Sequence, residues 1–166
     1  MFLISIAMHK DAMAALAQQN HYLARTILES DDEVDRFSLY IVRNLVMATK
    51  NERILQEMGL RDPSDSLSYR IAVRSIERVA DHAAGIADKS LKITEKISIE
   101  VIQELDKMSR ISIALLNDSV EAFLRRDYYL ADGIVDKTED IRSLENEIIL
   151  FLDKEKTPSS SAYISS

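Results

Sequence analysis

Two pairs of acidic residues lie four positions apart, the spacing that places side chains on one face of an α-helix. The first pair is Asp31 with Asp35, and the second is Glu77 with Asp81. Like charges at this spacing repel by about 0.2–0.5 kcal/mol, and a bound cation would reverse that cost. Because the chain contains no cysteine, a site built from these carboxylates favours oxygen-binding cations such as iron, manganese, magnesium or zinc.

The same acids also have an explanation that needs no metal. Arg74 precedes Glu77 by three residues, and Arg78 precedes Asp81 by three, so each acid can form an ion pair along its own helix. His82 follows directly, and a histidine in such a segment is more typical of a surface or packing position than of a metal ligand. The residues alone therefore leave a metal site and an ordinary charged helix face both open.

Long helices are the elements expected to position these acids. Only three glycines and two prolines interrupt the 166 residues, and few chain breaks favour long helices. In the segment of the second acidic pair, apolar residues recur three, four and seven apart, which predicts a buried stripe with Glu77 and Asp81 on the opposite side. The expected stripe consists of Leu67, Ile71, Val79, Ala83 and Ile86. The five expected helices cover residues 2–18, 21–58, 65–92, 97–126 and 129–154.

The first 45 residues of the chain recur near its end. The tripeptide at residues 22–24 returns at 129–131, and the tetrapeptide ISIA at residues 4–7 returns at 111–114, both with an offset of 107. Pairing the two segments without a gap gives thirteen identical positions. This self-similarity predicts two structurally related halves.

The repeat predicts the domain organisation. We expect a first three-helix repeat at residues 1–94, a second repeat at 95–156, and a flexible tail, or the start of a further helix, at 157–166. The segment 65–92 has no partner in the second half, which is therefore expected to lack its third helix. An apolar stripe left without that helix predicts a homodimer or a higher oligomer.

The second half has a weaker candidate metal pair. In the repeat pairing, Thr138 and Arg142 stand where the first half has its first acidic pair, so those carboxylates are lost. Asp136 and Asp140 still lie four residues apart. They form a second candidate metal site, which the sequence supports less than the first.

Composition and missing motifs exclude several function classes. The formal net charge of −7 disfavours direct nucleic-acid binding, because contacts to phosphate require basic patches. A run of about 20 apolar residues is absent, so no transmembrane helix is expected. The chain also has no Glu-x-x-His motif, phosphate-binding glycine loop or nucleophile elbow, and we therefore expect no enzymatic activity.

Two segments resemble the PhoU family of phosphate-uptake regulators, most closely its archaeal members. They are LARTILESDDEVDRFSLYIVRNL, which contains Asp31 and Asp35, and YRIAVRSIERVADHAAGIAD, which contains Glu77 and Asp81. The resemblance implies an all-α fold of tandem antiparallel three-helix bundles, with five of six helices present here. It also implies multinuclear clusters of iron, zinc or nickel, bound by these four acids on the bundle surface.

The family resemblance implies a cytoplasmic regulator that acts through protein contacts. The expected partner is a phosphate transporter subunit or a phosphate-signalling protein. Two alternatives remain. The first is a metal-free helical interaction or oligomerisation module of another transporter or channel, and the second is a carboxylate-bridged metal enzyme or iron store.

Overall fold

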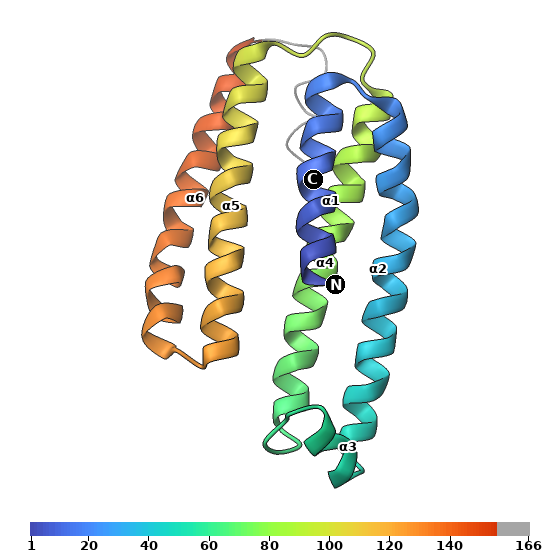
Figure 1. Ribbon diagram of the computed structural model, residues 1–166. Coiled ribbons are helices and arrows are strands. Elements are labelled where there is room, and N and C mark those ends of the chain that lie inside the picture. Colours follow the sequence, from blue (N-terminus) through green and yellow to red (C-terminus); the bar gives the residue numbers. More distant parts are fainter. Residues whose placement is uncertain (156–166) are drawn as a thin grey trace. The chain divides into compact units, whose positions relative to one another are not determined.

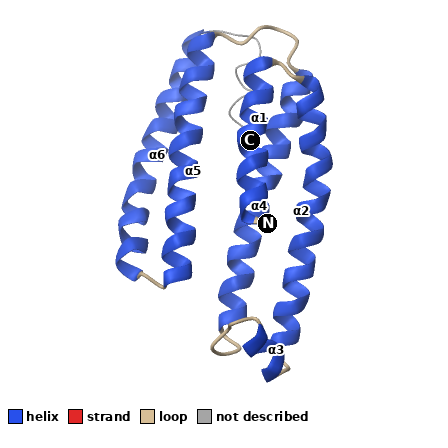
Figure 2. Cartoon of the chain, viewed as in Figure 1, coloured by secondary structure: helices blue, strands red, loops and turns tan. Residues whose placement is uncertain are grey.

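The computed structural model describes residues 1–155, without the side chains of Asp140 and of residues 153–155. All regular structure in this part of the chain is helical (Figures 1 and 2), which confirms the all-α prediction. The chain divides into two compact units, one formed by Met1–Lys92 and one that begins at Ile93. The tail expected at 157–166 lies outside the described residues.

One of the expected helices is divided in two, so the prediction of a single helix over residues 21–58 is wrong. The first helix of this segment ends at Ala48, and a short second one begins after Asn51. The Asn51 side chain accepts hydrogen bonds from the backbone N–H groups of Arg53 and Ile54, and this cap starts a new helix. The helices are α1 (Phe2–Gln18), α2 (His21–Ala48), α3 (Glu52–Glu57), α4 (Asp65–Lys92), α5 (Ile99–Arg125) and α6 (Tyr128–Glu155).

The two halves use the same turn between their first two helices. Gln19 has a left-handed backbone with φ of 51°, and the Asn20 side chain accepts a hydrogen bond from a backbone N–H of α2 at 3.1 Å. Arg126 and Asp127, offset by 107 residues, repeat this arrangement with φ of 57° and a hydrogen bond of 3.0 Å. The sequence repeat therefore corresponds to a repeated helical hairpin.

The core of the first unit lies between α1, α2 and α4. The α4 helix contributes the small residues Ala80, Ala83 and Ala87, which let α1 and α2 approach closely and bury Ile27 and Val34. Figure 1 shows that α1 runs beside only one half of the α2–α4 pair. Towards the other end, a separate apolar cluster joins α2 to α3 and to the loop that follows; its buried members are Leu45, Ala48, Leu55 and Leu60.

The buried face of α4 differs from the expected apolar stripe. Leu67 and Ile71 are each 62% exposed, and the buried line consists mostly of small side chains. Close helix packing selects for small residues at the contact, so hydropathy alone misplaces the face. The buried residues of α4 are Asp65, Ser66, Val73, Glu77, Ala80, Ala83, Ala84, Ala87 and Ser90.

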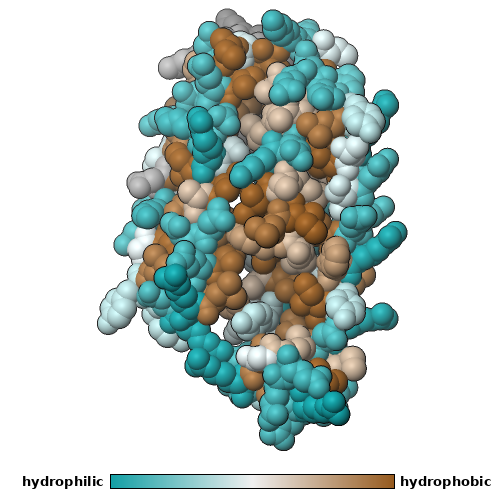
Figure 3. Space-filling view, viewed as in Figure 1, coloured by the Kyte–Doolittle hydropathy of each residue, from teal (hydrophilic) through white to brown (hydrophobic). Residues whose placement is uncertain are grey.

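In the second unit, α5 and α6 pack as an antiparallel hairpin around Leu115, Ala122 and Ile134. Large apolar side chains remain exposed in both units, and Figure 3 shows hydrophobic residues between hydrophilic ones on one face of the molecule. None of the described helices has the length and apolar character that crossing a bilayer requires.

Candidate metal site

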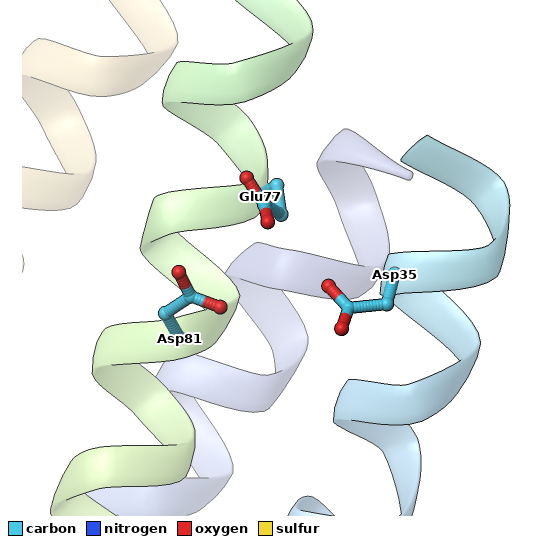
Figure 4. A group of neighbouring side chains, drawn as sticks. All are labelled: Asp35, Glu77 and Asp81. Atoms are coloured by element: carbon cyan, nitrogen blue, oxygen red, sulfur yellow. The ribbon is translucent and has the colours of Figure 1, made fainter. Parts of the chain in front are cut away.

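Three of the four predicted acids converge where α2 packs against α4. Each of Asp35, Glu77 and Asp81 offers a carboxylate oxygen, and these oxygens all lie within 4.8 Å of one another. Figure 4 shows Asp35 reaching from α2 towards the two acids of α4. Ligand oxygens about 2.0–2.6 Å from one ion are separated by roughly 3–5 Å, so the three carboxylates have the spacing of a cation site.

The fourth acid, Asp31, lies beside this group and has an unsatisfied buried oxygen. Its Oδ1 atom is inaccessible to solvent and has no hydrogen-bond partner. Burial raises the pKa of the Asp31 carboxyl, and the neighbouring charges of Asp81, Asp35, Asp32 and Glu77 raise it further. A buried polar oxygen without a partner raises the free energy of the folded state. A cation at this position would offset both the desolvation of that oxygen and the repulsion between the carboxylates.

Glu77 is buried, which corrects the expectation that it lies on a solvated face. Its side chain is only 11% exposed, and Nη1 of Arg74 donates to both of its carboxylate oxygens. The sequence offered two ion pairs that would compensate these acids without metal, and the pair between Arg74 and Glu77 is one of them. Among the ion pairs of the described residues, none joins Arg78 to Asp81.

The acidic group contains no imidazole. His82 follows Asp81 in α4, but its electrostatic neighbour is His9 of α1. Burial lowers the pKa of His9, and the charge of His82 lowers it further. The donors at the α2–α4 contact are therefore carboxylate oxygens, which suit hard or borderline cations such as iron, manganese or zinc. The residues present fit the metal that the family resemblance implies.

Comparison with known proteins connects this helical arrangement with a family. The family model described as the PhoU domain matches residues 1–90 and 105–164. The chain belongs to the PhoU family. The two matched segments lie in the two compact units, and the first contains all four acids of the candidate metal site.

Several PhoU relatives are similar over most of this chain. The accessory protein PhoU homolog 1 of the phosphate-specific transport system of Thermotoga maritima is 30% identical over 151 residues, covering 84% of this chain and 61% of the relative. The corresponding Aquifex aeolicus homologue is 26% identical over 137 residues, covering 82% and 60%. This chain thus spans about three fifths of the length of both relatives.

A solved PhoU structure has the same fold. The crystal structure of the phosphate transport system regulatory protein PhoU from Streptococcus pneumoniae superimposes with a TM-score of 0.79. The match covers 98% of this chain and 77% of that protein at 24% sequence identity. The similarity confirms the helical-bundle architecture that the sequence predicted.

The second candidate metal pair of this PhoU-family chain stays a prediction. Asp136 is exposed on α6, whereas the side chain of Asp140 lies outside what the structure describes. Among the described side chains, the group formed by Asp35, Glu77 and Asp81 is the one with the geometry to hold an ion.

Proposed function

We propose that this chain regulates phosphate transport through protein contacts on the cytoplasmic side of the membrane, and that it binds metal at the α2–α4 contact. Its membership of the PhoU family supports the first part, since relatives in that family are named as accessory proteins of phosphate-specific transport systems. The convergence of carboxylates from two helices supports the second. We assign the chain no catalytic role.

The observation that carries the metal site is the buried Oδ1 of Asp31 beside three converging carboxylates. Asp35 and Asp81 are exposed and would bind the ion from opposite helices, while Glu77 would bind it from the buried side. A bound metal supplies positive charge that links α2 to α4. The family-implied candidates are iron, zinc and nickel, as divalent or trivalent ions.

The partner that we propose is a phosphate transporter subunit or a phosphate-signalling protein. Without metal, the α2–α4 surface presents several uncompensated carboxylates, and this potential would repel acidic surfaces. With metal, the same surface would be neutralised and the two helices held in one arrangement. Metal occupancy would therefore control whether this face can dock on a protein.

Metal binding is tested by isothermal titration of the chelator-treated protein with Fe²⁺, Zn²⁺ and Ni²⁺. Wild type should bind, and the Asp35→Asn/Asp81→Asn double variant should bind at least about tenfold more weakly. Glu29→Gln/Glu33→Gln is the matched control, because it removes two exposed charges from the same acidic segment of α2. Equal weakening by both variants would show a general charge effect and reject the site.

The regulatory role is tested in the native cells. Deleting the gene should leave phosphate uptake high when phosphate is ample, and the wild-type chain should restore restraint. The Asp35→Asn/Asp81→Asn variant should restore it less than Glu29→Gln/Glu33→Gln does. Unchanged phosphate uptake after deletion would reject the regulatory proposal while leaving the metal site intact.

The ion pair between Arg74 and Glu77 favours the second candidate, a metal-free interaction module. In that case the guanidinium already compensates Glu77, and the other three acids, Asp31, Asp35 and Asp81, form a permanently charged docking face. Elemental analysis of protein purified without chelator distinguishes the two. Metal in wild type that is absent from Asp35→Asn/Asp81→Asn supports the bound ion, and equal metal content supports the module.

A further inference from the structure

The surface of α2 beside the candidate metal site is basic and apolar. Leu39 and Val46 follow Asp35 by four and eleven residues, so they share its face of the helix. Leu39 is 66% exposed and Val46 is 50% exposed. Arg36 and Arg43 flank these two side chains and are also exposed. Neither arginine forms an ion pair with any residue that the structure describes.

The adjoining side of α4 has the same character. Arg74 and Arg70 precede Glu77 by three and seven residues, so they lie on its face of the helix, and Leu67 lies about one turn further from the acids. Leu67 is 62% exposed. Arg74 is paired with Glu77, whereas Arg70 has no ion-pair partner among the described residues.

The antiparallel packing of α2 and α4 brings these two sets of residues together. The acidic group fixes the register of the helices at one point, and the packing of Tyr69 against the cluster that contains Leu45 fixes it at another. Between these points Arg43 lies level with Arg70. Two cations at one level repel each other unless an anion lies between them. We call the whole set the basic face, which consists of Arg36, Leu39, Arg43, Val46, Leu67, Arg70 and Arg74.

The basic face contrasts with the charge of the rest of the chain, whose formal net charge is −7. Residues 36–50 contain two arginines and one lysine, and residues 66–76 contain two arginines, without an acid in either segment. Residues 29–35 of α2, by comparison, contain five acids. Charge is therefore separated along the α2–α4 pair, and an anionic ligand would be attracted to one part of it only.

We propose that the basic face binds the surface of an anionic lipid bilayer. Arginines between exposed leucine and valine side chains form the pattern by which helices bind lipid surfaces. The guanidinium groups attract headgroup phosphates, and the apolar side chains enter the boundary between headgroups and acyl chains. A free phosphate ion would use the arginines but would gain nothing from the exposed leucines.

The extent of the basic face also favours a lipid surface. At a rise of about 1.5 Å per residue, the face extends over about 15 Å of α2 and about 10 Å of α4. Exposed apolar side chains from two adjacent helices suit a broad, flat surface better than the narrow stripe of one partner helix. Since the remainder of the chain is acidic, the same bilayer would repel it, and the basic face would set the orientation of the bound protein.

Vesicle flotation with the full chain and purified lipids tests the charged part of this contact. Chelator is present, so that no metal bridges protein and lipid. Wild type should bind vesicles of phosphatidylglycerol and phosphatidylcholine in equal parts, should not bind phosphatidylcholine alone, and should bind less at high salt. Arg43→Gln/Arg70→Gln should bind at least about tenfold more weakly. The control Lys10→Gln/Arg25→Gln removes two exposed cations outside the face, and should bind within about twofold of wild type.

The apolar part of the contact is tested without changing any charge. Leu39→Ser/Leu67→Ser should bind the anionic vesicles at least about threefold more weakly, because two side chains that enter the lipid boundary are lost. The control Leu3→Ser/Leu124→Ser alters two similarly exposed leucines outside the face, and should bind like wild type.

A single tryptophan reports which surface meets the lipid, because the natural chain contains none. The fluorescence of Leu39→Trp should shift to shorter wavelength when phosphatidylglycerol vesicles are added, since its indole enters a less polar environment. The fluorescence of Leu3→Trp should not shift.

Three results would overturn the proposal. The first is no binding of wild type to phosphatidylglycerol vesicles, which would leave an acidic protein surface as the ligand of this face. The second is binding that the arginine and leucine variants leave unchanged, and the third is an equal shift of both tryptophans. Circular dichroism of each variant establishes that it is folded. Because these experiments contain neither metal nor a transporter, their failure would leave the metal and regulatory proposals untouched.

Discussion

Asp35 on α2 and Asp81 on α4 present carboxylate oxygens within 4.8 Å of each other, together with Glu77. The two aspartates are far apart in sequence, and their proximity depends on the antiparallel packing of two 28-residue helices. Two exposed acids held this close repel each other unless a cation intervenes. The contact between α2 and α4 is therefore expected to respond to metal.

Metal should raise the thermal stability of this protein. An ion that binds only the folded chain adds about 2.7 kcal/mol at a hundredfold excess over its dissociation constant. Calorimetry of the chelated protein with added Zn²⁺ or Fe²⁺ should therefore show a higher Tm, and chelator should reverse the change. The Asp35→Asn/Asp81→Asn variant should show no such increase, whereas an equal increase would mean that metal binds elsewhere.

Replacing Asp31 by Asn should have opposite effects with and without metal. The folded-state pKa of Asp31 is raised above its ordinary value of 3.8, so its protonated form favours folding and its ionised form opposes it. At neutral pH, Asp31→Asn should stabilise the metal-free protein. This advantage should vanish as pH falls to about 3.8 and below, where Asp31 is protonated in both states. Urea unfolding across this pH range measures the difference.

With metal bound, the same substitution should weaken binding, because a carboxylate is lost from the edge of the site. Titration of metal into Asp31→Asn measures this loss. Unchanged stability of the metal-free variant at neutral pH would contradict the account of Asp31 as a carboxylate whose Oδ1 is buried without a partner.

Removing Arg74 should tighten metal binding. Its guanidinium occupies both oxygens of Glu77 and must release them when an ion binds. Because the Arg74 side chain is 60% exposed, the competing ion pair is worth less than about 1 kcal/mol, and Arg74→Gln should tighten binding about two- to fivefold. The control Arg78→Gln alters the adjacent turn without touching this pair, and should have a smaller effect.

Asn51 should contribute measurably to stability although it is exposed. Its side chain caps α3 through two hydrogen bonds, of 3.0 and 3.3 Å. Asn51→Ala should lower the free energy of unfolding by about 1 kcal/mol, and Asn51→Asp should restore most of it. Equal stability of all three proteins in urea would show that α3 is held by Leu55 and its apolar neighbours alone.

Two leucines of α2 should respond very differently to truncation. Leu45 is 2% exposed within the cluster that joins α2 to α3, and Leu45→Ala should cost about 2–5 kcal/mol. Leu39 is on the exposed face, and Leu39→Ala should change the unfolding free energy of dilute protein by less than about 0.5 kcal/mol. Chemical denaturation of both variants distinguishes a core position from a surface one.

The sequence predicted most of the helices because their signals are local. Turn residues such as Asn20 and Asp127 cap the helix that follows them, and the repeat offset relates the two turns directly. The sequence does not predict the division after Ala48, because no glycine or proline marks it. Asn51 caps a new helix only where the preceding helix has already ended, so its presence alone does not indicate a break.

The identity of the acids, and the face that each pair shares, were determined by the sequence alone, since a four-residue spacing fixes direction within one helix. Only the tertiary structure decided that Asp35 meets Asp81, that Glu77 is buried, and that Leu67 is exposed. Helical periodicity gives the relative angles of side chains around the axis of their own helix. It gives neither the rotation of the helix about that axis relative to its neighbours nor the axial register between helices. Both are set by close packing of small residues such as Ala80, whose positions carry little hydropathic signal.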